Sequence, residues 1–211
     1  IGGRNMTIRQ ETNYPWDGEV NIRISIDEPT VFTLRLRLPS WCVKPELSIN
    51  GERVNLAELE EGGYASINRS WQKDDIVSLE LPMPIERLYA HPQVSADVGS
   101  VALRRGPIVY CLEQADHDVP LHRILLSAQS SFNARYDPEL LGGVVLLEGQ
   151  GMALSDEGWN DLLYSKIPPT AKPCTVRAIP YYAWEHRTPG QMTVWIRERP
   201  ATLEATSVES S

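Results

Sequence analysis

Apolar and polar residues alternate along the first part of the chain. Apolar side chains occupy every second position over residues 20–26 and again over residues 32–38. Because successive side chains of a strand point to opposite faces of a sheet, this period of two predicts half-buried β-strands. Pro39 has no backbone N–H to give to a sheet and ends the second run. Two neighbouring antiparallel strands are expected here.

The dipeptide Asn50-Gly51 predicts the tightest connection in the chain, because both residue types tolerate the positive φ angles of a two-residue hairpin. Helical periodicity is weak, with one turn expected near 55–61 and one or two turns near 159–164. The sixteen prolines and fourteen glycines supply frequent breaks, so the pattern predicts an all-β fold of the sandwich type. Further strands are expected over residues 64–68, 76–81, 101–103, 108–112, 144–148, 175–179 and 192–197.

Length and composition are those of a chain that folds around its own core. The 211 residues are 42% hydrophobic, enough for one or two domains without a disulfide framework. Acidic side chains outnumber basic ones by 28 to 20, and the net charge of −8 argues against nucleic acid as a partner. No apolar run approaches the roughly 20 residues of a membrane span. The opening Ile1-Gly2-Gly3-Arg4 indicates a piece of a longer protein.

The three cysteines, Cys42, Cys111 and Cys174, are widely spaced and sit in apolar surroundings. They fit neither a disulfide framework nor a metal-ligand spacing. Unpaired cysteine packs as a small apolar residue. We therefore expect buried thiols and a reducing, cytoplasmic compartment.

Residues with catalytic chemistry are present but form no recognisable motif. The candidate acids are Asp97, Glu113, Asp156 and Glu157. Among 28 acidic residues, solvated surface positions are the expected explanation for them. The histidines, which show no zinc-ligand spacing, are His91, His117, His122 and His186. We expect no catalytic residue, no cofactor-binding residue and no metal ligand in this chain.

Residues 113–137 are the least patterned part of the chain. They carry Asp116, Asp118 and two histidines between weak strand signals, which leaves open an independent enzyme site in this excursion. Such a site needs converging acids with shifted pKa values in a cleft. Beyond residue 200 the chain is rich in Ala, Thr, Glu and Ser, so a flexible tail is expected over residues 202–211.

Aromatic residues are the one feature that points toward carbohydrate. The chain has six tryptophans and eight tyrosines, and the C–H faces of sugars stack on such rings. Two clusters stand out, Tyr14-Pro15-Trp16 and Tyr181-Tyr182-Ala183-Trp184. The sequence leaves two interpretations open: the rings fill a core or a domain junction, or they form a platform for sugar.

Several ordered segments resemble the C-terminal β-sandwich region of glycoside hydrolase family 127, the β-L-arabinofuranosidases. The most specific strings are Arg105-Gly106-Pro107-Ile108-Val109-Tyr110-Cys111 and Ile179-Pro180-Tyr181-Tyr182-Ala183-Trp184. Lys73 departs from the family pattern, where glycine is commoner, and residues 113–137 match only loosely. Shorter matches follow in chain order at residues 13–18, 38–42, 49–51, 63–64, 81–84, 89–92 and 192–195.

The resemblance implies a longer enzyme whose N-terminal (α/α)6 barrel holds a cysteine nucleophile, an acid/base glutamate and a zinc site built from Cys and Glu. That barrel is missing from this sequence, and the three cysteines match motifs of the sandwich region, so neither role is carried onto them. The resemblance also implies two antiparallel, jelly-roll-like β-sandwiches packed in tandem, over residues 1–95 and 96–201. The strand at 192–197 could also return to the first sandwich.

The leading hypothesis is structural: the chain packs against the barrel of the same polypeptide, and a homodimer is a second expected assembly. The expected barrel contacts are Tyr14, Trp16 and Asp17. The alternative is a carbohydrate-binding module, in which rings among Trp16, Tyr181, Tyr182, Trp184 and Trp195 hold the glycan. Its candidate sugar contacts are Tyr181, Tyr182 and Trp184. Solvent exposure of these rings separates the two hypotheses.

Overall fold

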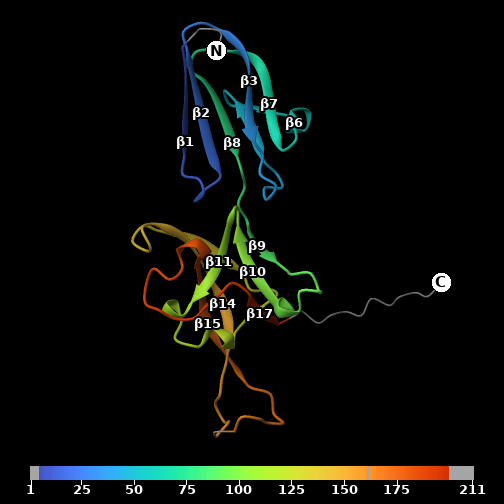
Figure 1. Ribbon diagram of the computed structural model, residues 1–211, viewed down its shortest axis with the longest axis vertical. Coiled ribbons are helices and arrows are strands. Elements are labelled where there is room, and N and C mark those ends of the chain that lie inside the picture. Colours follow the sequence, from blue (N-terminus) through green and yellow to red (C-terminus); the bar gives the residue numbers. More distant parts are fainter. Residues whose placement is uncertain (1–4, 161, 200–211) are drawn as a thin grey trace, which may run out of the picture. The chain divides into compact units, whose positions relative to one another are not determined.

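The computed structural model describes residues 5–160 and 162–199, and the tail predicted over residues 202–211 lies outside them. The described chain is built of β-strands and short 3-10 turns, so the predicted all-β class is confirmed. It divides into two compact units (Figure 1). No helical segment in the described ranges is long and apolar enough to cross a membrane.

The boundary between the units falls between Pro84 and Ile85, whereas the sequence placed it between residues 95 and 96. The reason is a strand pairing. Strand β9 (Ile85–Leu88) runs antiparallel to β10 (Ser100–Arg105), and this ladder ties it to the second unit. With only four residues and no clean alternation, β9 left no strand signal in the sequence.

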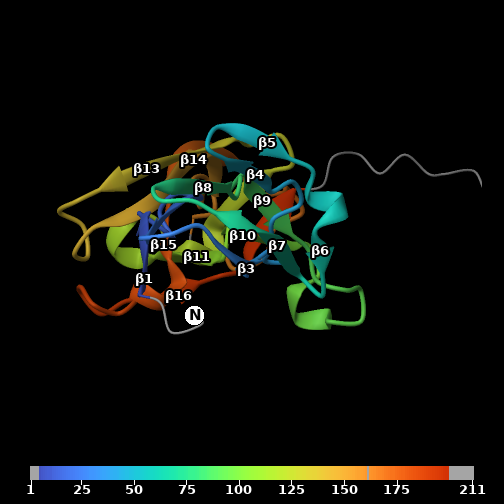
Figure 2. The same cartoon turned by 90° about the horizontal axis from the view of Figure 1, so that it is seen from above.

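The first unit is a sandwich of two sheets, with the strand orders β1-β2-β8-β4-β5 and β3-β7-β6. Viewed from above, β8, β4 and β5 lie in one layer and β3, β7 and β6 in the other (Figure 2). The strands are β1 (Met6–Thr12), β2 (Glu19–Ile26), β3 (Thr30–Arg37), β4 (Glu46–Ile49), β5 (Glu52–Val54), β6 (Glu60–Glu61), β7 (Tyr64–Trp71) and β8 (Asp75–Glu80).

The two alternating runs at the start of the chain form β2 and β3, as predicted, but they are not neighbours. Strand β2 pairs with β1 and β8, whereas β3 pairs with β7 in the opposite sheet. The turn over residues 27–29 therefore carries the chain across the sandwich. Alternation records which face of a strand is buried, and it is silent about the pairing partner.

The predicted hairpin at Asn50-Gly51 is confirmed and joins β4 to β5. Both residues have positive φ, 53° and 84°, as a type I′ turn requires. The flanking residues Ile49 and Glu52 are cross-strand partners. The turn predicted near 55–61 is also present, as the 3-10 segment Leu56–Glu58, whose first turn is capped by the Asn55 side chain. The turn predicted near 159–164 is not helical at its described residues.

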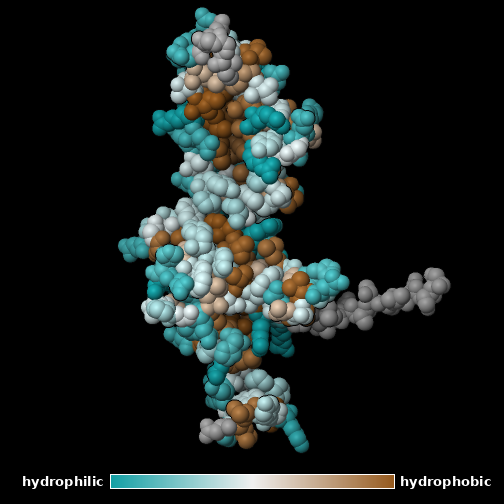
Figure 3. Space-filling view, in the orientation of Figure 1, coloured by the Kyte–Doolittle hydropathy of each residue, from teal (hydrophilic) through white to brown (hydrophobic). Residues whose placement is uncertain are grey.

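The core of the first unit is formed by the inward faces of both sheets. Ile24, Trp71 and Val77 are completely buried within it. The Trp71 indole stacks on Phe32, with ring centroids 5.5 Å apart, and its Nε1 donates to the Phe32 carbonyl oxygen at 3.0 Å. A buried indole N–H is thereby satisfied. Part of this core reaches the surface as an apolar stripe (Figure 3).

The second unit is a sheet that closes on itself. Strand pairing runs β11-β15-β14-β12-β17-β10, and β10 also pairs with β11. The final strands β16 and β17 pair with β11, β10 and β12, so residues 192–197 do not return to the first sandwich. Besides β9 and β10, the strands are β11 (Ile108–Glu113), β12 (Ile124–Ser127), β13 (Phe132–Asp137), β14 (Val144–Leu154), β15 (Ala171–Pro180), β16 (Met192–Thr193) and β17 (Ile196–Arg199).

The poorly patterned region 113–137 contains two strands that the sequence missed. Strand β12 pairs with β14 and, in parallel, with β17, and β13 pairs with β14. Between β11 and β12 the chain makes two 3-10 turns, Gln114–Asp116 and Leu121–Arg123. The first of these turns places Asp116 and His117 beside the end of β11.

Candidate functional site

A buried charged cluster lies where the sequence left open an enzyme site. Glu113 ends β11, Asp116 ends the following 3-10 turn, and Arg187 follows β15. Arg187 Nε donates to Glu113 at 3.0 Å, and Nη1 donates to Asp116 at 2.8 Å. The two carboxylate side chains are only 7% and 4% exposed. Hydrogen bonds to Asp116 and Glu113 raise the pKa of the Arg187 guanidinium. One arginine therefore binds both carboxylates inside the fold.

The cluster continues along the sheet through a second arginine. Arg177 on β15 lies 3.8 Å from Asp116 and donates from Nε to Glu148 of β14 at 3.0 Å. This contact lowers the pKa of the Glu148 carboxyl. Positive and negative groups alternate from Arg187 to Glu148, which is how buried or half-buried charges are tolerated in a fold. The arrangement is that of a structural ion network.

His117 belongs to the same structural group. Its Nδ1 lies 2.8 Å from the Glu113 carbonyl oxygen, and its Nε2 accepts the backbone N–H of Arg177 at 3.3 Å. Because Nε2 accepts, the proton sits on Nδ1, and both ring nitrogens of this neutral imidazole are occupied. The ring therefore has no free nitrogen for proton transfer or for a metal.

The remaining candidate acids and histidines are scattered over the surface. Asp156 pairs with Arg123 at 3.0 Å and Glu157 with Lys172 at 2.6 Å, in exposed ion pairs. His91, His122 and His186 are exposed, and Asp97 is half-buried in a different turn. Within residues 5–160 and 162–199, no three His, Cys, Asp or Glu side chains form a group that could hold a metal ion. The described residues therefore do not fit a zinc site.

No disulfide joins the three cysteines, all of which lie within the described residues, as the sequence predicted. Cys42 and Cys111 are buried and Cys174 is half-buried. Burial raises the pKa of the Cys111 thiol to about 12 and also raises that of Cys174. A nucleophilic cysteine needs the opposite shift, toward the thiolate. Cys111 and Cys174 therefore lack the electrostatic setting of a nucleophile.

The aromatic cluster after β15 is partly exposed. Tyr181 and Tyr182 occupy a 3-10 turn and are 44% and 60% exposed, whereas Trp184 is half-buried. Glu113 Oε1 accepts the backbone N–H of Glu185 at 2.7 Å and so anchors the segment that follows them. The two tyrosine rings are thus available at the surface on a backbone that the charged cluster holds in place.

The predicted barrel contacts lie together in the turn between β1 and β2. Tyr14 is exposed, whereas Trp16 and Asp17 are half-buried. Asp17 has a structural task, because its carboxylate accepts the Asn13 side-chain amide and the Glu19 backbone N–H, both at 3.2 Å. The turn is closed by the hydrogen bond from Trp16 N to Asn13 O at 2.8 Å. It presents one free aromatic face, that of Tyr14.

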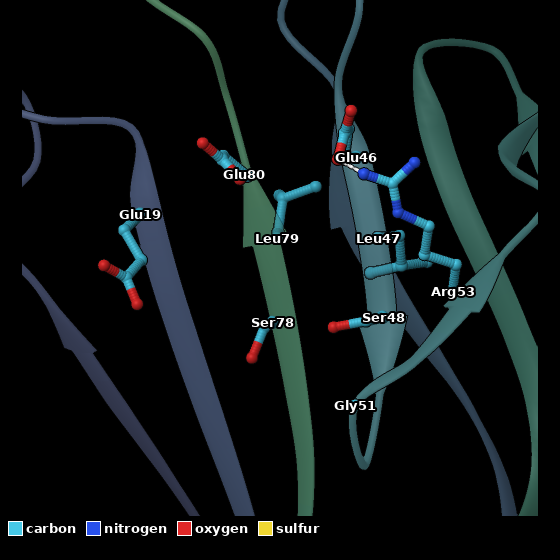
Figure 4. A pocket seen from close by; sticks show the side chains of 9 residues that line it. All are labelled: Glu19, Glu46, Leu47, Ser48, Gly51, Arg53, Ser78, Leu79 and Glu80. Atoms are coloured by element: carbon cyan, nitrogen blue, oxygen red, sulfur yellow. Dashed lines mark hydrogen bonds and ion pairs between the residues drawn. The ribbon is translucent and has the colours of Figure 1, made fainter.

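A shallow depression of about 400 Å³ lies on the outer face of the five-stranded sheet (Figure 4). Glu19, Glu80 and Glu46 stand in register across β2, β8 and β4, and Arg53 binds Glu46 at 2.5 Å. The remaining lining residues are small or aliphatic, and none is aromatic. The depression offers acidic groups without a ring on which a sugar could stack.

The sequence analysis also missed an exposed apolar loop in the second unit. The loop between β14 and β15 exposes Leu162, Leu163, Tyr164 and Ile167, with exposed fractions between 61% and 90%. Its base is closed by a hydrogen bond from Ser155 N to Thr170 O at 2.8 Å. Four apolar residues in six could have signalled it, but such a run reads equally well as a buried segment.

The geometry defines a tandem of two all-β units, and comparison with known proteins gives the same division. Residues 1–83 match the family model of the GH127 β-L-arabinofuranosidase middle domain, and residues 85–197 match that of the glycoside hydrolase family 127 C-terminal domain. Together the two matches span nearly the whole chain. The chain belongs to glycoside hydrolase family 127.

Relatives agree with this assignment. A non-reducing end β-L-arabinofuranosidase of Bifidobacterium longum subsp. longum is 32% identical over 202 residues, which are 91% of this chain and 30% of the relative. The crystal structure of a GH127 β-L-arabinofuranosidase from Geobacillus stearothermophilus, Ara127N-Se, is 48% identical with a TM-score of 0.90. The aligned region covers 94% of this chain and 31% of the Geobacillus chain. The GH127 β-arabinofuranosidase BT3674 is 34% identical, with a TM-score of 0.83 and coverages of 94% and 32%. The chain thus spans about a third of its relatives' length.

Proposed function

We propose that this chain is the non-catalytic β-region of a longer glycoside hydrolase that acts on β-L-arabinofuranosides, and that it supports the catalytic barrel of the same polypeptide. Two observations together support the proposal: the part of the family that the chain matches, and the way in which its buried acidic side chains are bound. The chain matches the family's middle and C-terminal domains and only about 30% of a relative's length. Among its buried acids, Glu113 and Asp116 are bound to an arginine, and Asp75 accepts hydrogen bonds from the Asn50 side chain and the Gln72 backbone N–H.

The turn that carries Tyr14, Trp16 and Asp17 is the barrel contact, because it offers an exposed ring on a hydrogen-bonded turn. The nucleophile and any zinc belong to polypeptide outside this chain. A homodimer is the second assembly that we propose, and the lack of a disulfide among the three cysteines motivates a cytoplasmic location.

Hydrolysis of an aryl β-L-arabinofuranoside tests the catalytic part of the proposal. The purified 211-residue chain should release no more phenol than a protein-free blank, whereas the longer polypeptide with its barrel should turn the substrate over. The cysteine-specific reagent iodoacetamide provides a control, since it should stop only the longer enzyme. Steady release by the purified chain would end the proposal.

A second function has one observation in its favour, the exposure of Tyr181 and Tyr182. Titration calorimetry of the chain with methyl β-L-arabinofuranoside measures it directly. A sugar-binding role requires millimolar or tighter binding that is lost when both tyrosines are changed to alanine. Tyr164→Ala is the matched control, because that ring is 90% exposed on a different loop. Absence of binding by the unmodified chain would remove this function.

A further inference from the structure

The connection between β14 and β15 projects from the second unit. The ladder of these two strands ends at the pair Leu154–Ala171, and the chain beyond it forms a loop that extends away from the sheet (Figure 1). We call the described part of this loop, residues 155–160 and 162–170, the arm. None of the described arm residues is buried. The arm therefore contributes nothing to the core of its own unit.

The tip of the arm is apolar and open to water. It consists of Leu162, Leu163, Tyr164 and Ile167, and the side chains of Leu163 and Tyr164 are 85% and 90% exposed. The space-filling view shows apolar side chains gathered on the arm (Figure 3). Single apolar residues are common on a protein surface, but a contiguous group marks an interaction site. The tip therefore needs a partner.

Hydrogen bonds order the arm before any partner binds. Ser155 N donates to the Thr170 carbonyl oxygen at 2.8 Å and closes the base of the arm. Leu162 N donates to the Trp159 carbonyl oxygen at 2.8 Å and closes a turn just before the tip. A segment that is already ordered loses less conformational entropy when it binds. The arm thus presents its tip on a supported backbone.

The charged side chains at the base of the arm are already paired. Asp156 binds Arg123 at 3.0 Å, and Glu157 binds Lys172 at 2.6 Å. These pairs satisfy the acidic groups within the second unit itself. Four of the six positions from 162 to 167 are apolar. The surface that fits the tip is therefore an apolar hollow, and opposite charge plays little part in its recognition.

A second copy of this chain fits the tip poorly. In a two-fold dimer the arm would meet the same arm of the other copy, and two protruding tips cannot enclose each other. The tip also has the size of a patch on an ordinary monomer, about 300–600 Å², below the roughly 800 Å² per partner of a specific interface. The depression on the five-stranded sheet, lined by Glu19, Glu46 and Glu80, is too acidic to receive it.

We propose that the tip of the arm inserts into an apolar hollow on the catalytic part of the same polypeptide, outside this chain. This inference rests on the proposed function, because it takes the receiving surface from the longer enzyme. The matched region is 30% of the relative, so about 70% of that polypeptide lies outside it and can supply the hollow. Two surfaces on one polypeptide meet at a high effective concentration, so a patch too small for a free dimer is large enough here.

Hydroxyl-radical footprinting with mass spectrometry measures the exposure of the tip directly. In the 211-residue chain Leu163 and Tyr164 should be oxidised readily, because both are almost fully exposed. In the longer polypeptide the same side chains should lose most of this oxidation. Trp71 is completely buried and should stay unreactive in both proteins, which confirms that each is folded. Equal oxidation of the tip in the two proteins would overturn the inference.

Salt tests the chemistry of the contact. Protection of the tip in the longer polypeptide should persist in about 1 M sodium chloride, because salt screens ion pairs and leaves apolar contacts in place. Loss of protection at high salt would assign the contact to charge and contradict insertion into an apolar hollow.

A pair of variants tests the tip itself. Leu163→Asp changes a side chain that meets water in the 211-residue chain, so the thermal unfolding midpoint there should stay nearly unchanged. In the longer polypeptide the carboxylate cannot enter an apolar hollow, so the midpoint should fall by several degrees and Tyr164 should become open to oxidation. Leu163→Met is the matched control, because it keeps an apolar side chain of similar volume and should preserve both properties. An equal effect of Leu163→Asp on the two proteins would contradict insertion.

The two proposals fail in different experiments. If the purified chain hydrolyses arabinofuranosides, the proposed function is lost. If the longer polypeptide is active but its tip is oxidised as readily as in the isolated chain, support of the barrel stands and insertion of the arm does not. Protection that disappears when the longer polypeptide is diluted, or that appears in a concentrated solution of the 211-residue chain alone, would assign the tip to a second copy and also overturn the inference.

Discussion

At the scale of single residues, Arg187 shows how this chain accommodates buried charge. Its guanidinium joins Glu113 at the end of β11 to Asp116 in the next turn. Glu113 also holds the backbone of Glu185, whose φ of 65° is rarely adopted by residues other than glycine. The network thus fixes a strained connection 72 residues away in sequence. The network holds the backbone in position, and removing one of its members should lower the free energy of unfolding.

We expect Glu113→Gln to lower the free energy of unfolding by about 2 kcal/mol, because a charged hydrogen bond to Arg187 is lost inside the fold. Urea denaturation at neutral pH measures this. Glu157→Gln is the control, since the Glu157–Lys172 pair is exposed and should leave the urea midpoint unchanged. Equal midpoints for Glu113→Gln and the unmodified chain would show that the network carries no stability.

The Tyr110 hydroxyl gives a prediction about alkaline pH. Burial raises the pKa of Tyr110 to about 12, whereas an unfolded tyrosine titrates near 10. Between about pH 10 and 12 the unfolded chain loses this proton while the native chain keeps it. The stability linked to Tyr110 is therefore complete below about pH 10 and is lost as the pH rises through 12. Burial of Cys111 acts with the same sign from about pH 9 upward.

Tyr110→Phe keeps the buried ring and removes the titrating hydroxyl, so the decline of stability above about pH 9 should become shallower. Urea midpoints collected between about pH 8 and 11 provide the measurement. Tyr164→Phe changes an exposed ring and should follow the unmodified chain throughout. An alkaline decline that is identical in all three proteins would rule out Tyr110 as a source.

At the scale of elements, the pairing of β2 with β8 depends on one glycine. Gly18 precedes β2, and its carbonyl oxygen accepts the backbone N–H of Leu81 at 3.0 Å. A β-carbon at Gly18 would overlap the carbonyl group of Leu81. Because the obstacle is backbone rather than a flexible side chain, the two strands would have to separate to make room.

Gly18→Ala should therefore cost about 2 kcal/mol of unfolding free energy, within the range known for overpacking. Gly51→Ala makes a useful comparison, because its β-carbon would meet open space and only the φ of 84° opposes it. That variant should cost about 1 kcal/mol. Thermal unfolding of the two proteins ranks them, and a smaller loss for Gly18→Ala than for Gly51→Ala would contradict the close approach.

At the scale of the whole molecule, the chain is two units with separate interiors. The core cluster of the first unit draws only on residues between Ile22 and Leu81. The second unit has its own buried set on β10, β11, β12, β14 and β15. Its strand ladder closes on itself and leaves no pairing to the first unit among the described residues. Each unit therefore has its own hydrophobic core, which is what a domain needs to fold cooperatively.

We expect residues 1–84 and 85–211, produced as separate polypeptides, each to unfold in one cooperative transition. Circular dichroism during heating should show midpoints close to those in the intact chain. Within the intact chain, Glu113→Gln should shift only the transition of the second unit. A fragment without a cooperative transition would show that the units depend on each other for folding.

Sequence reasoning succeeded where the signal was local. Alternation located β2, β3 and β8, and Asn50-Gly51 located a hairpin, because both depend on a few adjacent residues. It failed at β1 and β9, which are edge strands whose exposed residues need no regular pattern. Tyr181 and Tyr182 stay predictions as sugar contacts, and their exposure depends on how β15 ends against β11.

By itself, the sequence determined the all-β class, the hairpin, the lack of a disulfide framework and the family, since each rests on local periodicity, on residue type or on strings of adjacent residues. Only the tertiary structure decided which sheet each strand joins and that Arg187 binds two acids more than 70 positions away. These outcomes depend on strand pairing between distant segments, and no stretch of sequence carries the identity of its partner.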